Sequence, residues 1–326
     1  MPRVALLDDY QNVALDYADW SRLPGDFQVE AFSDHLTDED ALVKRLEPFE
    51  FIQAMRERTP FPASLLERLP NLRYLITTGA RNASIDMAAC TRLGIVCSGT
   101  GYKERATSEL TWGLIHCLTR DLLGEIQAVK DGAWQIDVGL DLEGATLGLL
   151  GLGRIGGQMA AVANAFGMNV LAWSQNLTEE RARECNVRKV SKEELLAQAD
   201  IVSVHVVLSD RTRGLLGKAE LARMKPTAYL VNTSRGPIVD EQALAEALNN
   251  GRIAGAGIDV FEEEPLAADH PFRRTRNLLI TPHIGYVTAG TYRIFYGETV
   301  EDILGYLDGK PPRVINKDVL GKERKL

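Results

Sequence analysis

A glycine-rich turn between a strand and a helix constrains the fold of this chain more than any other feature. Residues 146–157 read Thr-Leu-Gly-Leu-Leu-Gly-Leu-Gly-Arg-Ile-Gly-Gly, in which Gly151, Gly153 and Gly156 form the pattern Gly-x-Gly-x-x-Gly. An apolar strand is predicted at residues 146–150, before the turn, and a helix at residues 155–166 after it. Glycine allows the tight turn, the close approach of a pyrophosphate and close helix–strand packing. The pattern predicts a parallel α/β sheet that binds a dinucleotide at a helix N-terminus.

The same alternation of apolar strands and helical stretches continues along the whole chain. Further helices are expected at residues 192–199 and 241–249. Further strands are expected at residues 4–7, 51–54, 74–77, 95–97, 170–173, 201–206, 228–232, 257–260 and 278–281. Strands that alternate with helices imply parallel sheets covered by helices on both faces.

The length of 326 residues suggests two domains, because single hydrophobic cores stop growing near 250–300 residues. A long helical pattern at residues 104–130 follows a glycine-containing junction near residue 100. Another helix, at residues 289–307, comes too late to belong to a further strand–helix unit. We therefore expect residues 1–100 and 287–326 to form one domain, with residues 101–286 inserted into it. The charged tail after residue 319 is expected to fray.

Composition excludes several classes of protein. The formal net charge of −8, with no basic tract, disfavours a nucleic-acid partner. No apolar run reaches the ~18 residues of a membrane span, and the N-terminus turns acidic too early for a signal peptide. The cysteines are scattered without a Cys-x-x-Cys pair, which indicates reduced thiols in a cytoplasmic protein, and no metal-ligand set is predicted.

The end of the strand after the glycine turn leaves the choice between NAD and NADP open. Binding sites for NAD usually carry an acidic residue there, which bonds the ribose 2′-hydroxyl. This chain has Ser174, which can bond a hydroxyl but does not repel a 2′-phosphate. Arg181 and Arg183 follow, and the sequence favours a solvated helix face for both.

Charged or titratable residues follow three later strands. Arg235 lies in Asn-Thr-Ser-Arg-Gly-Pro, Asp259 and Glu264 lie in Asp-Val-Phe-Glu-Glu-Glu-Pro, and His283 lies in Thr-Pro-His-Ile-Gly. Taken singly, each has a purely structural interpretation. Ligands bind at the carboxyl ends of parallel strands, so residues that follow successive strands on the dinucleotide edge of one sheet indicate a catalytic site.

These motifs, in this order and spacing, resemble the D-isomer-specific 2-hydroxyacid dehydrogenases, a family that includes phosphoglycerate dehydrogenases and glyoxylate/hydroxypyruvate reductases. The resemblance covers nearly the whole chain. It implies a Rossmann doubly wound parallel-sheet domain inserted into a smaller flavodoxin-like α/β substrate domain. It further implies NAD or NADP as cofactor, a small 2-hydroxy/2-oxo acid as substrate, and a homodimer paired through the cofactor domain.

The resemblance assigns roles to these residues. His283 is the acid/base, Glu264 bonds its other ring nitrogen, and Arg235 grips the substrate carboxylate. The physical chemistry agrees, since a carboxylate fixes the useful imidazole tautomer and a guanidinium binds a carboxylate through two bonds. The expected cofactor-binding residues are Gly151, Gly153, Arg154, Ile155, Gly156, Ser174, Thr233 and Asp259, with Asp259 at the nicotinamide carboxamide.

The family also holds the substrate carboxylate through the backbone of a loop in the first domain. Here that loop contains Gly79, Ala80 and Arg81, and Arg81 stands where the family commonly has a second glycine. One candidate to bind a second anionic group on the substrate is Arg81, and Arg56 and Arg58 are others. The alternative for all three is that the side chain points outward into solvent. His35, His116, His205 and His270 are expected to be structural.

Two competing functions differ in their fit. Formate dehydrogenases share the implied fold, but they typically have glutamine where Glu264 stands, so Glu264 argues against that activity. A non-catalytic NADH-sensing protein of the corepressor type carries similar motifs and is the main alternative. Such proteins are expected to have long flexible extensions, and this chain shows no such segment.

Overall fold

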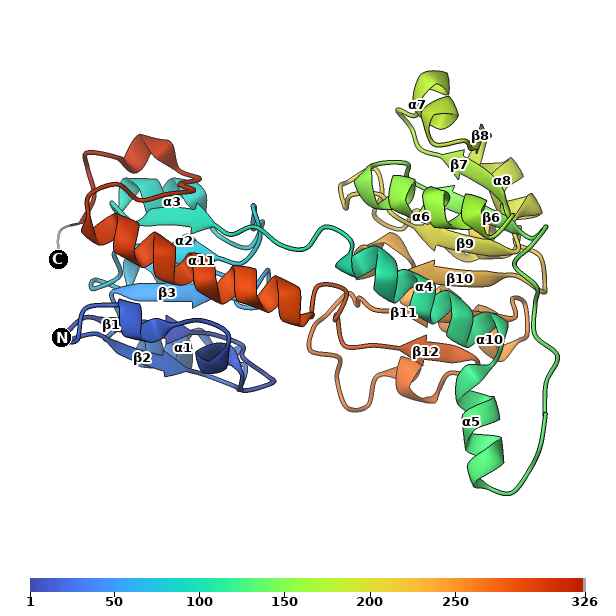
Figure 1. Cartoon of the computed structure of the whole chain (residues 1–326), viewed down its shortest axis with the longest axis horizontal. Helices are drawn as coiled ribbons and strands as arrows, with labels where there is room; N and C mark the ends of the chain where they lie inside the picture. Colours follow the sequence, from blue (N-terminus) through green and yellow to red (C-terminus); the bar gives the residue numbers. More distant parts are fainter. Residues whose placement is uncertain (325–326) are drawn as a thin grey trace. The chain divides into compact units, whose positions relative to one another are not determined.

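The computed structural model describes residues 1–324, which form two compact units. Unit 1 comprises residues 1–103 and 287 onward, and unit 2 comprises Glu104–Tyr286. The chain therefore leaves unit 1, builds unit 2 and returns to complete unit 1 with its last helix (Figure 1). The first boundary lies after Lys103, whereas the sequence placed it after residue 100.

Unit 1 is a five-stranded parallel sheet in the order β2-β1-β3-β4-β5, the order of flavodoxin-like folds. Helices α1–α3 pack on one face, where they bury the apolar cluster around Ile52, Leu75 and Cys97. Helix α11 packs on the other face, where Tyr306 contacts Phe51 and Tyr74. The elements of unit 1 are β1 (Arg3–Leu6), β2 (Gln28–Ala31), α1 (Glu39–Leu46), β3 (Phe51–Ala54), α2 (Ala63–Glu67), β4 (Tyr74–Thr77), α3 (Met87–Arg92), β5 (Val96–Gly99) and α11 (Ala289–Leu307).

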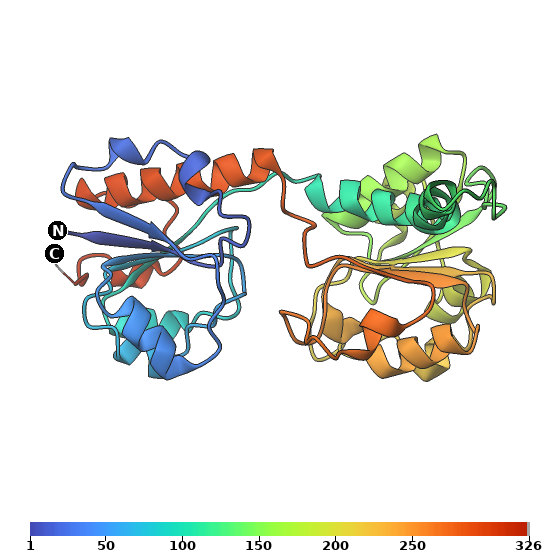
Figure 2. The ribbon, with the colours of Figure 1, turned by 90° about the horizontal axis from the view of Figure 1, so that it is seen from below.

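Unit 2 is a seven-stranded parallel sheet in the order β12-β11-β10-β9-β6-β7-β8. All strands run in the same direction, and the order in which the chain adds them switches from one side of β6 to the other. This switch is the doubly wound arrangement of a Rossmann domain. Helices α4 and α6 contact the strands on one face and α8 contacts them on the other, as Figure 2 shows from below. The strands are β6 (Thr146–Leu150), β7 (Asn169–Trp173), β8 (Arg188–Lys189), β9 (Ile201–Val204), β10 (Tyr229–Asn232), β11 (Gly255–Ile258) and β12 (Leu278–Ile280).

The helices of unit 2 are α4 (Ala106–Thr119), α5 (Leu122–Lys130), α6 (Arg154–Ala165), α7 (Glu179–Glu184), α8 (Lys192–Gln198), α9 (Lys218–Leu221) and α10 (Glu241–Asn249). The predicted single helix over residues 104–130 is wrong, because the chain breaks into α4 and α5. Asp121 adopts a left-handed conformation (φ +39°) at the break, and its carboxylate accepts the N–H of Gly124 to cap α5.

Apart from the helix break, the predicted fold class and the predicted strands agree closely with the structure. Two further strands and the tail differ from the prediction. Strands β2 and β8 were not predicted, because both are short and polar. The expected fraying of the tail is wrong as far as residue 324. Arg324 donates its backbone N–H to Gly94 and its guanidinium to the carbonyl of Leu69. Residues 325–326 lie outside the described part of the chain.

Candidate active site

The glycine turn of unit 2 joins β6 to α6 and has the geometry of an anion cradle. Gly151 has φ +105°, and a Cβ there would lie 2.7 Å from the backbone of His205. A Cβ on Gly156 would lie 2.1 Å from the carbonyl oxygen of Gly151. A Cβ on Gly153 would instead meet nothing within 4 Å. Gly151 and Gly156 are therefore glycine for folding, whereas Gly153 keeps open the space that a phosphate group needs.

The N-terminus of α6 faces this open space without a capping side chain. Gly153 is its N-cap residue, and glycine has no side chain that could cap the helix. A twelve-residue helix that lacks a side-chain cap attracts an anion through its first N–H groups and through its dipole. The Arg154 guanidinium donates to the carbonyl of Glu104 at 3.0 Å, which holds that charge beside the turn.

The end of β7 corrects one expectation from the sequence. Arg181, expected on a solvated helix face, donates its Nε to the carbonyl of Leu152 at 3.2 Å, inside the glycine turn. The Arg183 side chain donates its Nε to the carbonyl of Glu179 in its own helix, as a residue on a helix face does. Ser174 is partly buried at the end of β7 and accepts the N–H of Leu177 through its carbonyl. The Arg181 cation is thus held at the glycine turn, a contact that the sequence pattern did not indicate.

Three neighbouring strands of unit 2 end at the other predicted site residues. Arg235 follows β10, Asp259 follows β11 directly, and His283 follows β12. Because β10, β11 and β12 are adjacent and parallel, these residues lie along the carboxyl edge of one sheet. Glu264 comes from the connection between β11 and β12.

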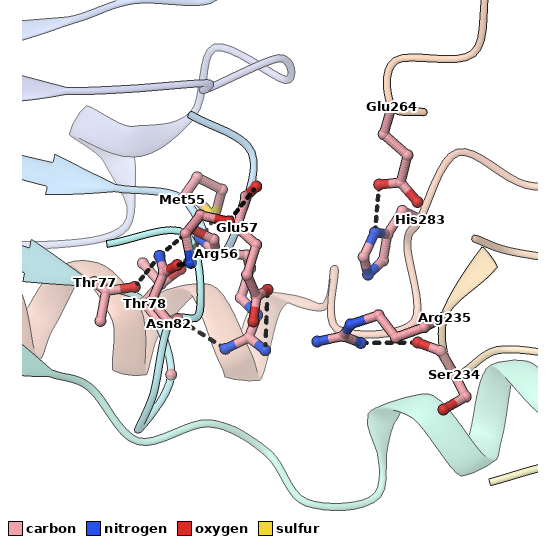
Figure 3. A network of polar contacts seen from close by, with 12 residues as sticks. Met55, Arg56, Glu57, Thr77, Thr78, Asn82, Ser234, Arg235, Glu264 and His283 are labelled. Carbon is pink, nitrogen blue, oxygen red and sulfur yellow. Dashed lines mark hydrogen bonds and ion pairs between the residues drawn. The ribbon is translucent and has the colours of Figure 1, made fainter. Parts of the chain in front are cut away.

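His283 and Glu264 form a short charge-assisted pair. Nδ1 of His283 lies 2.6 Å from Oε2 of Glu264, and Figure 3 shows the two side chains facing each other. The other carboxylate oxygen, Oε1, accepts the backbone N–H of Phe261 at 2.9 Å, which orients the glutamate. The two side chains are 18% and 23% exposed, so both remain within reach of a ligand. His283 also has φ +54°, a conformation that a non-glycine residue adopts only where its surroundings hold it.

Asp259 supplies that hold. Its side chain is buried, and Oδ1 accepts the Thr281 hydroxyl at 2.6 Å and the Ile284 N–H at 2.9 Å. Oδ2 accepts the Gly285 N–H at 2.9 Å. Burial raises the pKa of Asp259 above its usual range, while these bonds favour the carboxylate. Asp259 therefore fixes the turn that carries His283, a role that sequence reasoning missed.

Arg235 stands on a segment that is wedged against the glutamate loop. A Cβ on Gly236 would lie 2.0 Å from the carbonyl carbon of Phe261, so the two backbones touch. Asn232 donates its side-chain amide to the Arg235 carbonyl, and the Arg235 guanidinium donates to the Ser234 carbonyl at 2.8 Å. The predicted cofactor residue Thr233 is buried, and its hydroxyl lies 2.8 Å from that of Thr111 on α4.

The predicted substrate loop lies in unit 1, at the carboxyl end of β4. Gly79 has φ +86° and donates its N–H to the Thr100 hydroxyl at 2.9 Å. The N–H groups of Ala80 and Arg81, both exposed residues, make no hydrogen bond to the described residues 1–324. The Arg56 guanidinium lies over Gly79 and donates to the Thr78 carbonyl at 2.8 Å. Arg56 and Thr78 are labelled in Figure 3. Two backbone donors and one cation are thus presented together.

Residues near the N-terminus, which the sequence did not single out, support the segment after β3. The Arg58 guanidinium lies 4.9 Å from the centre of the Tyr10 ring, a cation–π contact. Asp8, buried after β1, accepts the Thr59 hydroxyl at 2.7 Å and pairs with Nδ1 of His35 at 2.8 Å. The acidic Leu-Leu-Asp-Asp-Tyr stretch at residues 6–10 was the available signal.

Comparison with known proteins identifies the family. The model of the D-isomer specific 2-hydroxyacid dehydrogenase NAD binding domain matches residues 112–285. Glyoxylate reductase of Aeropyrum pernix is 39% identical over 267 residues, which cover 78% of this chain and 80% of that protein. This chain belongs to the D-isomer-specific 2-hydroxyacid dehydrogenase family. A D-3-phosphoglycerate dehydrogenase of Archaeoglobus fulgidus is 34% identical over 84% of this chain and 52% of its own length.

The solved structures place this D-2-hydroxyacid dehydrogenase in the same fold. An oxidoreductase from Ralstonia solanacearum has a TM-score of 0.91 at 38% identity, covering 98% of both chains. The protein is thus an NAD(P)-dependent oxidoreductase, and its cofactor is NAD or NADP. The non-catalytic alternative gains no support from these matches. None of the helices formed by residues 1–324 combines the length and apolar character needed to cross a bilayer.

Proposed function

We propose that this dehydrogenase interconverts a D-2-hydroxy acid and its 2-oxo acid, with His283 as the acid/base and Glu264 as its partner. The observation that carries the proposal is the 2.6 Å contact between His283 Nδ1 and Glu264 Oε2. That bond assigns Nδ1 to the glutamate, so the proton exchanged with substrate sits on Nε2. During oxidation Nε2 takes the hydroxyl proton, and during reduction it returns a proton to the carbonyl oxygen.

Arg235 is the proposed ligand of the substrate carboxylate and the group that stabilises the developing alkoxide charge. In unit 1, the N–H groups of Ala80 and Arg81 are proposed backbone donors to a carboxylate, while the N–H of Gly79 stays with Thr100. Arg56 and Arg58 follow β3 in the same unit. Although Arg56 also pairs with Glu57 at 3.7 Å, these two guanidinium groups are the proposed ligands of a second anionic group on the substrate, a carboxylate or a phosphate.

The cofactor site that we propose is built on unit 2. Its residues are Gly151, Gly153, Arg154, Ile155, Gly156, Ser174, Thr233 and Asp259. The open space at Gly153 and the uncapped start of α6 fit a pyrophosphate. The bound nicotinamide supplies or accepts the hydride, while this chain orients it and exchanges the proton at His283.

The test is a panel of 2-oxo acids, with and without a second carboxylate or phosphate, assayed with NADH and with NADPH through the absorbance of the reduced nicotinamide. His283→Ala is expected to lower turnover roughly 10²–10⁴-fold, and Glu264→Gln about 10–100-fold, since it weakens one charge-assisted bond. His270→Gln is the matched control, because His270 also pairs with a glutamate, Glu241, at 3.1 Å. Turnover that survives in folded His283→Ala would refute the assignment.

We further propose that the enzyme is a homodimer paired through the cofactor domain, in the cytoplasm. Helix α5 and the segment after it extend from unit 2 (Figure 1) and expose apolar side chains at Leu122, Leu123, Ile126, Val129, Trp134, Ile136 and Val138. An apolar cluster of this kind marks a protein interface. Leu123→Glu with Ile126→Glu should convert a dimer to a monomer in light-scattering chromatography, whereas Leu15→Glu, at an exposed apolar residue of unit 1, should not.

A further inference from the structure

Unit 1 contains a cavity that the proposed catalytic residues do not explain. Its volume is about 680 Å³, within the range of roughly 300–1,000 Å³ typical of small-molecule sites. It lies between the loop after β4, the end of β5 and the segment at residues 311–320. That segment pairs with β5 through an antiparallel bridge between Ser98 and Val314. All the lining residues belong to unit 1, so the cavity is complete within that unit.

The charged residues that line this cavity are all cationic. Arg81, Arg313 and Lys317 contribute to its wall, and no acidic side chain does. Arg313 is neutralised by the buried Asp302 at 2.9 Å, by Glu301 at 3.1 Å and by Glu298 at 3.6 Å.

The side chains of Arg81 and Lys317 differ from that of Arg313, because neither makes a hydrogen bond or ion pair with another of the described residues 1–324. Both are exposed. Two uncompensated cations on one cavity repel each other and attract an anion.

Apart from Thr100, the uncharged lining residues are apolar or glycine. Pro311, Val314, Ile315 and Leu320 line the cavity on the side of the returning chain. A site with aliphatic walls and two cations suits a molecule with an apolar body and one anionic end. An inorganic ion alone would leave the aliphatic wall uncovered.

The cavity shares a wall with the proposed substrate loop. Ala80 and Arg81 line it, and both supply N–H groups to our proposed carboxylate site. The loop is pinned at its base, where Gly79 donates to Thr100 and a Cβ on Gly99 would lie 2.6 Å from the Gly79 carbonyl oxygen. An anion that draws the Arg81 side chain into the cavity therefore restricts the backbone of Ala80 and Arg81.

We propose that this cavity is a second ligand site, for a small organic anion with an apolar body and a carboxylate or phosphate end, and that its occupancy changes the affinity for the 2-oxo acid. The binding part stands on the cavity alone. The coupling part rests on the proposed substrate role of the loop. The two parts are measured separately below, so failure of one is distinguishable from failure of the other.

The binding test uses calorimetric titration of the full-length enzyme with phenyl phosphate and with phenylacetate, which separate a phosphate from a carboxylate preference. Phenol, which lacks the charge, is the control probe. One or both anions should bind, and Lys317→Glu should weaken that binding at least about tenfold, as reversal of one of two cations implies. Lys44→Glu, at an exposed lysine on α1, should leave it unchanged.

Arg235→Ala separates this cavity from the proposed active site. The proposal expects the probe to bind Arg235→Ala as tightly as wild type. It is overturned if neither anion binds at millimolar concentration, if phenol binds equally well, or if binding is lost in Arg235→Ala and kept in Lys317→Glu.

The coupling test measures KM for the best 2-oxo acid at increasing probe concentration. Wild type should show a probe-dependent KM, and Lys317→Glu should keep its basal rate but lose that dependence. If KM stays constant while the probe is shown to bind, the coupling is refuted and the second ligand site still stands.

Discussion

His205 is the residue for which the structure makes the sharpest quantitative prediction. It follows β9, its Nε2 lies 2.8 Å from the hydroxyl of the fully buried Ser203, and its backbone forms the wall behind Gly151. Burial lowers the pKa of His205 to about 4, because a charged ring at this position would lose its solvation. Between about pH 4 and 6.5, the His205 ring is therefore neutral in the folded enzyme but protonated in an unfolded chain.

The sign and size of the effect follow directly. As the pH falls below the ordinary histidine value of 6.5, the unfolded chain binds the proton first, and the folded state loses relative stability. The contribution is fully present above pH 6.5 and is lost as the pH falls to about 4. Each tenfold difference in proton affinity is about 1.4 kcal/mol, so the loss is roughly 3 kcal/mol.

His205→Gln isolates this contribution, since a glutamine amide can still reach Ser203 but does not titrate. Urea unfolding of wild type and variant, followed by circular dichroism from neutral pH to about 4, gives the difference in unfolding free energy. That difference should shift by roughly 3 kcal/mol in favour of the variant on acidification. His116→Gln, at a histidine that packs against Trp112 and Phe166, is the matched control. A difference that stays constant across this range would refute the reasoning.

Three substitutions test the construction of the site. Gly236→Ala drives a Cβ into the backbone of Phe261. The free energy of unfolding, measured in urea, should fall by about 1–3 kcal/mol, and kcat/KM should fall at least about tenfold. Asp259→Asn turns an amide N–H toward the Gly285 N–H; denaturation should show a loss of about 1–3 kcal/mol and kinetics a lower kcat. Gly153→Ala meets open space; the melting temperature should hold while fluorescence titration shows NADH binding weakened about tenfold.

Much of the fold could be read from the sequence, because buried parallel strands are continuous apolar runs. Residues 51–54, 74–77 and 146–150 are fully or almost fully buried, and their predicted bounds agree with the structure. Strand β2 shows the limit of this reasoning. It lies at the sheet edge with alternating exposure, so its polar sequence carries no apolar run. The break between α4 and α5 was missed for a related reason, since the apolar periodicity continues across Asp121 while its backbone turns left-handed.

The site was predictable to a different degree in each unit. In unit 2, strand ends placed Arg235, Asp259 and His283 on one sheet edge, as parallel topology requires. What Asp259 contacts was not predictable, because its bonds to Ile284 and Gly285 depend on how the next turn folds back. The contact between Arg181 and the Leu152 carbonyl was hidden for the same reason.

The hydrogen bonds described above that orient the proposed catalytic pair lie within unit 2. Glu264 is oriented by the Phe261 N–H, His283 by Glu264, and the turn beneath His283 by Asp259. Such a network keeps the imidazole tautomer and orientation fixed before any ligand arrives, which lowers the reorganisation needed during proton transfer. The cations that would distinguish substrates, Arg56 and Arg58, are held instead by unit 1, through Thr78 and Tyr10. If the proposed roles hold, acid/base chemistry and substrate choice are built on separate cores, and substitutions at Tyr10 should then alter KM among substrates while turnover at the dyad is kept.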